Sequence, residues 1–216
     1  MTRKKHYILI AAITVGVIII DQIIKILVKT NMQIGESIPV FGSWFQILFV
    51  ENEGMAFGMS FGGWVGKLLL SLFRLIASAA IMWYLLVQVR KDKSSVGMSI
   101  SLSLIFAGAV GNLIDCAFYG LIFDESYYHV AQLFPPEGGY APFLHGRVVD
   151  MFYFPLVDTV LPSWLPIWGG QHFVFFNAIF NFADAAITIG VFWIIILAYF
   201  MNKKSLKSDE KEKDAK

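Results

Sequence analysis

Long runs of apolar residues, separated by shorter polar stretches, divide this chain of 216 residues. A transmembrane helix needs about 20 mostly apolar residues to cross the hydrocarbon core of a bilayer. Four segments meet that requirement: residues 7–28, 68–89, 96–115 and 173–200. No A-x-A-like cleavage site follows Ile20, so we expect the first segment to be a span rather than a cleaved signal peptide. The pattern predicts a membrane all-α fold with four transmembrane helices.

The segments outside the predicted spans have other patterns. Residues 37–60 alternate apolar and polar positions around Gly and Pro, which favours a small extracytoplasmic β-sheet. Residues 116–172 are rich in aromatic residues, Gly and Pro, and predict a periplasmic loop or interfacial helix with Trp164 and Trp168 at the lipid interface. Residues 203–216, rich in Lys, Glu and Asp, predict a disordered cytoplasmic tail. A single four-span domain, residues 1–202, precedes that tail.

Composition agrees with a membrane location. The chain is 57% hydrophobic and 15% charged, with a mean hydropathy of +0.65, whereas soluble domains are about 25% charged. One cysteine, Cys116, excludes an intramolecular disulfide framework. No Cys/His cluster has metal-ligand spacing, no Gly-rich phosphate loop follows a strand pattern, and no His is convincingly paired with Ser or Cys. We therefore expect no cofactor and no Ser or Cys nucleophile.

Basic residues gather in three places along the chain. Lys and Arg accumulate in cytoplasmic segments close to the membrane. Most of the 17 basic residues lie before the first span, between the second and third, or after the fourth. The other two connecting segments, 29–67 and 116–172, contain only Lys29, Lys67 and Arg147. Both termini are therefore predicted to be cytoplasmic.

Four aspartates lie where a lipid-embedded chain normally avoids charge. Asp21, Asp115 and Asp184 are in or at the edge of predicted spans, and Asp150 is in the short apolar stretch 145–154. An ionised carboxylate in hydrocarbon is unfavourable, so such residues usually face a bundle interior or a wet cavity and often mark function. The predicted topology brings all four to the outer membrane surface.

Two short motifs lie in the first half of the chain. Asp21 and Lys25 are four residues apart on one helix face, and a structural ion pair explains them better than direct chemistry. Asn52 and Gly54 follow the predicted strands. Asn52 has an amide to offer a peptide substrate, but a hairpin turn with a polar cap explains the same residues equally well.

The third predicted span ends in a polar motif. Gly108 and Gly111 are small residues spaced for close helix contact. Asn112 and Asp115 are three residues apart and therefore face the same side. Helix packing with a polar plug and a functional site both remain open for this motif.

Asn181 and Asp184 likewise share one face of a predicted helix. A lone Asp in an apolar span needs a partner, since burial otherwise forces it into the neutral form. The most economical partner is a second carboxylate that shares one proton, and Asp150 is the best candidate. In such a pair the ionised acid activates water and the neutral acid protonates the leaving group.

These motifs occur in one order across the four predicted spans. They are Asp21-x-x-x-Lys25, Asn52-x-Gly-x-Ala-Phe57, Gly108-Ala-x-Gly-Asn-x-x-Asp115, Val148-Val-Asp150 and Phe180-Asn-x-Ala-Asp184. Over residues 7–200 the chain resembles the bacterial lipoprotein signal peptidases, the signal peptidase II family.

The resemblance implies an aspartyl endopeptidase of the bacterial inner membrane. Such an enzyme uses acid–base activated water to remove the signal peptide of a prolipoprotein just before its diacylglyceryl cysteine. Asp150 and Asp184 match the catalytic pair, and Asp21 and Lys25 match a structural motif. The supporting polar positions are Asn52, Gly54, Asn112, Asp115 and Asn181. The expected partners are the prolipoprotein and membrane lipids, without nucleic acid, and the expected state is a monomer.

Two features depart from the family pattern. Cys116 stands where the family usually has Arg, and Arg147 is our hypothesis for a replacement that contacts substrate. The segment between Asp115 and Asp150 is also longer than the family leads us to expect, and the extra piece is a candidate lid or lipid contact.

Two other classes of protein explain part of the pattern. A small transporter would use Asp21, Asp115 and Asp184 as a proton relay, but it predicts carboxylates spread through the membrane depth. A membrane scaffold with buried ion pairs does not explain Asp150 and Asp184, since Asp184 is the only charged residue of its predicted span.

Overall fold

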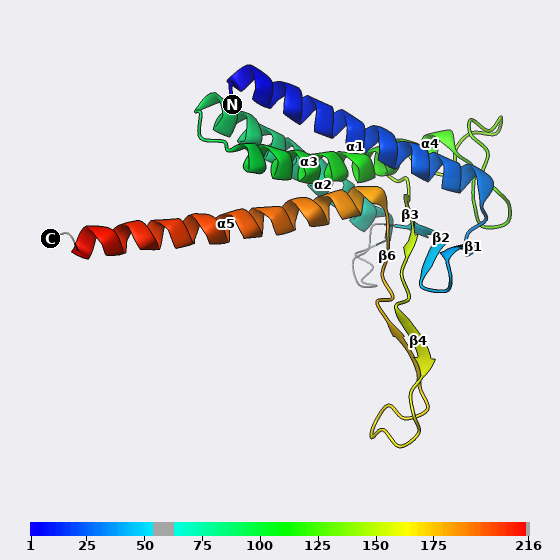
Figure 1. The fold of residues 1–216 in the computed structure, drawn as a ribbon. Coiled ribbons are helices and arrows are strands. Elements are labelled where there is room, and N and C mark those ends of the chain that lie inside the picture. Colours follow the sequence, from blue (N-terminus) through cyan, green and yellow to red (C-terminus); the bar gives the residue numbers. More distant parts are fainter. Residues whose placement is uncertain (54–62, 215–216) are drawn as a thin grey trace. The chain divides into compact units, whose positions relative to one another are not determined.

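Four long helices dominate the computed structural model, which describes residues 1–53 and 63–214 and side chains as far as residue 203 (Figure 1). They are α1 (Arg3–Asn31), α2 (Gly63–Arg90), α3 (Val96–Ile114) and α5 (Phe182–Asp214). In the described part of the chain, each is long and apolar enough to cross a membrane. The predicted class, four transmembrane helices with a small β-sheet, is confirmed.

The fourth helix differs from its predicted boundaries. It begins at Phe182 rather than at residue 173, because residues 172–175 and 179–180 form strands. At its other end it continues to Asp214, so the segment expected to be a disordered tail is helical as far as that residue. A run of apolar and aromatic residues has the same high hydropathy whether it forms a strand or a helix. Hydropathy therefore predicted a start of the fourth span that is too early.

A short irregular segment continues α3. The π-helix η1 (Asp115–Tyr119) leads into α4 (Gly120–Ile122), and most residues of η1 are buried. A π-turn adds a residue to the helical repeat and is frequent at functional sites. Here it begins at Asp115, one of the four aspartates that the sequence places in or beside apolar segments.

Two antiparallel sheets complete the fold. The larger has the order β1-β2-β3-β6, and the smaller pairs β4 with β5. The strands are β1 (Ser37–Phe41), β2 (Phe45–Asn52), β3 (Val148–Tyr153), β4 (Val157–Val160), β5 (His172–Phe175) and β6 (Ile179–Phe180). The alternating pattern predicted β1 and β2. It did not predict β3, which carries Asp150 opposite Val50 of β2.

The chain divides into two compact units, each with its own apolar core. The first comprises residues 1–20, 73–111 and 183–216, and the second comprises 21–72 and 112–182. The core of the first contains Ile10, Leu85, Val89 and Leu102. The larger core of the second contains Val28, Met32, Phe49, Tyr119, Phe123, Ala131, Val149 and Met151. The single peptidase domain over residues 1–202 stays a prediction.

Glycines allow α3 and α5 to approach closely within the first unit. A Cβ atom at Gly108 would overlap the backbone carbonyl oxygen of Ala183. A Cβ atom at Gly190 would lie 2.7 Å from the carbonyl oxygen of Ser101. Small residues at such crossings let membrane helices pack backbone against backbone. The close helix contact predicted for Gly108 is confirmed.

Replacing Gly108 with Ala should lower the thermal unfolding midpoint of the purified protein in detergent. The new methyl group would force α3 away from Ala183, and overpacking of this kind costs about 1–3 kcal/mol. Gly16→Ala is the matched control, because a Cβ atom there meets nothing within 4 Å. The control should keep or slightly raise the midpoint, since Ala favours helix. Equal midpoints for the two variants would contradict the proposed contact.

Candidate active site

A lysine without exposed surface lies at the centre of a polar cluster in the second unit. The Nζ atom of Lys25 is 2.9 Å from Oδ2 of Asp21, one turn earlier on α1, and 2.8 Å from Oδ2 of Asp115. It also donates a hydrogen bond of 2.9 Å to Oδ1 of Asn112. All three charged side chains are 0% exposed. The predicted pairing of Asp21 with Lys25 is confirmed, and Asp115 joins it.

Gln22 ties the two carboxylates together from the side. Its Nε2 donates to Oδ2 of Asp21 at 3.1 Å and to Oδ1 of Asp115 at 3.0 Å. Its Oε1 accepts a hydrogen bond of 3.0 Å from the hydroxyl of Tyr119. Sequence reasoning did not single out Gln22 or Tyr119, although Gln22 is the direct neighbour of Asp21. Together these contacts join the C-terminal half of α1 to η1.

Asp115 also holds the strand that carries Asp150. Its Oδ2 accepts a hydrogen bond of 3.2 Å from the backbone N–H of Val149 in β3. Val149 is completely buried, and Asp150 is 4% exposed. The same carboxylate therefore pairs with Lys25 and fixes the backbone next to Asp150.

Two asparagine amides hold Asp150, and a third asparagine connects one of them to the lysine cluster. The amide of Asn181 donates to Oδ1 of Asp150 at 2.6 Å, and the amide of Asn52 donates to Oδ2 at 3.3 Å. Asn181 also donates to Oδ1 of Asn112 at 3.0 Å, which links Asp150 to the lysine cluster. Asn181 is fully buried and Asn112 is 6% exposed. The structure thus brings together four of the residues predicted for the site: Asn52, Asn112, Asp150 and Asn181.

Two further predicted residues are Asp184 and Gly54. Asp184 belongs to the first compact unit and is half-buried in the first turn of α5. A carboxylate in the first turn of a helix is favoured by the helix dipole. Gly54 lies outside the described residues, directly after Glu53.

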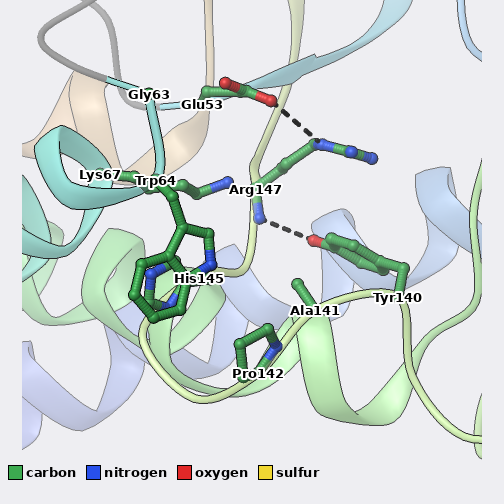
Figure 2. A pocket seen from close by; sticks show the side chains of 9 residues that line it. All are labelled: Glu53, Gly63, Trp64, Lys67, Tyr140, Ala141, Pro142, His145 and Arg147. Carbon is green, nitrogen blue, oxygen red and sulfur yellow. Dashed lines mark hydrogen bonds and ion pairs between the residues drawn. The ribbon is translucent and has the colours of Figure 1, made fainter.

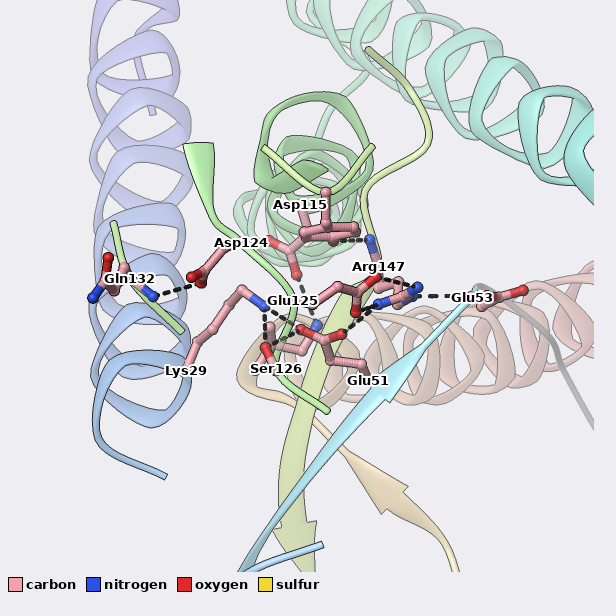
Figure 3. Close-up of polar contacts among 11 residues, drawn as sticks. Lys29, Glu51, Glu53, Asp115, Asp124, Glu125, Ser126, Gln132 and Arg147 are labelled. Atoms are coloured by element: carbon pink, nitrogen blue, oxygen red, sulfur yellow. Dashed lines mark hydrogen bonds and ion pairs between the residues drawn. The ribbon is translucent and has the colours of Figure 1, made fainter. Parts of the chain in front are cut away.

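A second charged cluster lies beside the first, on β2 and the segments around it (Figure 3). Lys29, one turn beyond Lys25 on α1, forms an ion pair with Glu51 of β2. Lys29 also donates a hydrogen bond of 2.6 Å to Ser126, which in turn donates to Glu51 at 3.0 Å. Lys29 and Glu51 are 0% and 1% exposed. The sequence analysis did not predict this cluster. Two features of the sequence could have indicated it: Lys29 shares the helix face of Lys25, and Glu51 directly precedes Asn52.

Arg147 joins this cluster from the start of β3. Its guanidinium makes a two-pronged contact with Glu125, with N–O distances of 2.8 and 3.1 Å, and a third contact with Glu51 at 3.2 Å. It also lies 4.8 Å from the ring centre of Tyr140. Burial lowers the pKa of Arg147, but the hydrogen bonds and charges of Glu125 and Glu51 outweigh it and raise the pKa. The guanidinium stays charged and is held in one orientation.

A cavity of about 290 Å³ opens beside Arg147 (Figure 2). Trp64 stacks on His145 in its wall with the ring centres 4.1 Å apart. The hydroxyl of Tyr140 accepts a hydrogen bond of 2.6 Å from the backbone N–H of Arg147. Other lining residues are Glu53, Gly63, Lys67, Ala141 and Pro142. Arg147 therefore lines a cavity and is paired with Glu125, Glu51 and, with its Nε 3.7 Å from Oε1, Glu53. The sequence had suggested only a substrate contact.

Among the residues that the structure describes, no group of three or more His, Cys, Asp or Glu side chains is arranged to hold a metal ion. The donors on Asp150 from Asn52 and Asn181 are neutral amides. Neutral donors orient a carboxylate without placing a full positive charge beside it. The arrangement suits acid–base chemistry.

Comparison with known proteins gives one consistent family. A family model described as signal peptidase (SPase) II matches residues 13–200. The lipoprotein signal peptidase of Porphyromonas gingivalis is 51% identical over 203 residues, covering 94% of this chain and 87% of that protein. The lipoprotein signal peptidase of Amoebophilus asiaticus is 37% identical over 200 residues, covering 91% and 79%.

Solved structures agree with this comparison. A bacterial membrane enzyme has a TM-score of 0.60 with 28% identity and covers 90% of each chain. A second bacterial membrane enzyme has a TM-score of 0.56 with 29% identity and covers 88% of this chain and 91% of that one. The fold and the sequence therefore point to the same kind of protein.

Lys25→Met should strongly lower the thermal unfolding midpoint, because it leaves Asp21 and Asp115 buried without their shared cation. Breaking a buried ion pair costs about 3–5 kcal/mol. Lys91→Met, at an exposed lysine between α2 and α3, is the control and should change little. Adding Asp21→Asn to Lys25→Met should restore part of the loss. A Lys25→Met protein as stable as the control would refute the cluster as a source of stability.

Proposed function

The chain belongs to the signal peptidase II family, and on that premise we propose that Asp150 and Asp184 are the catalytic pair of this lipoprotein signal peptidase. The protein is an aspartic endopeptidase of the bacterial membrane that removes signal peptides from prolipoproteins. This family membership sets aside the transporter and the scaffold considered from the sequence. The position of Asp150, held by two amides in a strand fixed by Asp115, carries the proposal.

The proposed mechanism is hydrolysis without a covalent intermediate. One carboxylate takes a proton from water as the oxygen attacks the scissile carbonyl carbon. The other carboxylic acid gives its proton to the amide nitrogen as the C–N bond breaks. Because two interacting acids titrate as a unit, the two roles belong to Asp150 and Asp184 together.

The amides around the pair have a supporting role in this proposal. Asn52 and Asn181 orient Asp150, and Asn112 connects Asn181 to Lys25. An amide can offer both a donor and an acceptor to a peptide backbone. We therefore assign Asn52, Asn112 and Asn181, with Gly54 two residues after Asn52, to holding the substrate peptide near the acids.

The proposed substrate is a prolipoprotein cleaved just before a cysteine modified with diacylglycerol. Its lipid would remain in the membrane between helices, where it supplies binding energy away from the scissile bond. No nucleic acid takes part, and the working state is a monomer. The basic residues at both ends and between α2 and α3 support cytoplasmic termini, with the active site at the outer face of the inner membrane.

The variants Asp150→Asn and Asp184→Asn should each lose cleavage, while the protein still inserts and folds. Loss of one catalytic acid or base should lower the cleavage rate at least about 10²–10⁴-fold. The assay measures release of the signal peptide from a purified diacylated prolipoprotein, and thermal unfolding reports on folding. Glu137→Gln is the control, since Glu137 is an exposed acid in the segment between α4 and β3. Substantial turnover in either active-site variant would overturn the assignment.

We further propose that Arg147 supports the site by fixing the start of β3 through Glu125 and Glu51. Arg147→Ala should then lower both cleavage and the unfolding midpoint. Arg147→Lys should recover only part of each, because Lys lacks the two-pronged fork. Arg90→Ala, at an exposed arginine at the end of α2, is the control. Full activity of Arg147→Ala would exclude any role in catalysis, and a raised KM at unchanged stability would favour direct substrate contact instead.

A further inference from the structure

The hairpin formed by β4 and β5 has almost no buried surface of its own. All four residues of β4 are exposed, and so are three of the four in β5. It extends beyond the four-stranded sheet of the second unit (Figure 1). A two-stranded hairpin by itself is at best marginally stable in water. Something else must therefore stabilise residues 155–176.

The hairpin has one apolar face and one polar face. Residues directly opposite each other in an antiparallel pair point to the same side. Val157 pairs with Phe175 and Thr159 with Phe173, which gives an apolar face. Asp158 pairs with Val174 and Val160 with His172, and the two ionisable residues of this face lie 2.6 Å apart. The polar face suits water, whereas the apolar face needs a cover.

The tip of the hairpin has the composition of a membrane interface. Trp164, Ile167 and Trp168 are 78%, 84% and 59% exposed. Trp concentrates where lipid headgroups meet hydrocarbon. From residue 155 to 176 the sequence contains no Lys, Arg or Glu. Lipid offers no hydrogen-bond partner to a backbone N–H group. The three prolines in this segment have no backbone N–H, which makes the segment easier to place in lipid.

Chain connectivity places the base of the hairpin at the end of a membrane span. β3 leads into the hairpin, and the chain returns through β6, which pairs with β3. β6 ends at Phe180, and α5, a candidate span, begins at Phe182. The residues of the hairpin are therefore tethered close to the lipid surface, and they connect the strand of Asp150 to the helix of Asp184.

We propose that the β4–β5 hairpin lies on the membrane and inserts its apolar face and its tip into the outer leaflet. Its partner is lipid, which explains the Trp residues, the scarcity of charge and the tether to α5 together. The choice of leaflet rests on the proposed topology, but the lipid contact does not depend on which carboxylates catalyse. The hairpin connects β3 to α5. By holding this connection on the bilayer, it keeps the strand of Asp150 close to a substrate that is embedded in lipid.

Depth of insertion tests the proposal directly. Single nitroxide labels are attached at Phe173→Cys and Ile167→Cys, in nanodiscs of phosphatidylethanolamine and phosphatidylglycerol that hold one protein copy. The labelled parent protein measures the background from buried Cys116. Val160→Cys on the polar face and Tyr128→Cys, at a residue 92% exposed in another outer segment, are the controls.

The measured quantity is how often each nitroxide collides with oxygen, which concentrates in lipid, and with a nickel complex, which stays in water. The labels at residues 167 and 173 should collide mainly with oxygen, and those at 160 and 128 mainly with the nickel complex. Water-like accessibility at 167 and 173 would overturn the proposal. Protection that appears only in discs holding two copies would also overturn it, in favour of a contact between copies. The Asp150→Asn protein should show the same depths, so failure of the catalytic assignment and failure of the lipid contact are distinguishable.

Cleavage supplies a second measurement. The double variant Trp164→Ser, Trp168→Ser should lose activity several-fold on a prolipoprotein embedded in bilayers, because the tip no longer anchors. The same variant should cleave the detergent-solubilised substrate at the rate of the parent. An equal loss in both settings, or no loss in bilayers, would contradict the role assigned to the hairpin.

Discussion

The burial of Lys25 is the constraint on which the second unit depends. An ammonium group removed from water is tolerable only if carboxylates and amides surround it closely. Asp21 comes from the same helix, but Asp115 and Asn112 must arrive from the end of α3. Asp115 then fixes the backbone of Val149, next to the catalytic candidate. One buried charge thus organises a helix, a π-turn and a strand around the site.

Much of the fold could be predicted from the sequence, because a helix that crosses a membrane must be long and apolar and hydropathy detects such helices. The first three spans lie within a few residues of α1, α2 and α3, since a span must be long and apolar. The start of α5 was missed because the apolar run before it forms two short strands, β5 and β6, whose partners β4 and β3 lie earlier in the chain. Strand formation depends on such partners, and hydropathy does not reveal them.

The candidate site was predictable where its contacts are local. The spacing of Asp21 and Lys25 indicates their pairing directly, since helix neighbours are set by geometry. Gln22 with Tyr119, and Arg147 with Glu125, join residues far apart in sequence, so no spacing rule indicates them. The same separation explains why the sequence suggested a substrate contact for Arg147, although carboxylates hold it in the structure.

Two acids on different elements, Asp150 on β3 and Asp184 on α5, are proposed to act together as acid and base in hydrolysis. The most direct test is the rate of signal-peptide release as a function of pH, measured as kcat/KM in lipid nanodiscs. A pair in which one acid must be ionised and the other protonated gives a bell-shaped profile with an acidic and a basic limb. A rate that does not change with pH, or that follows a single titration, would contradict the account.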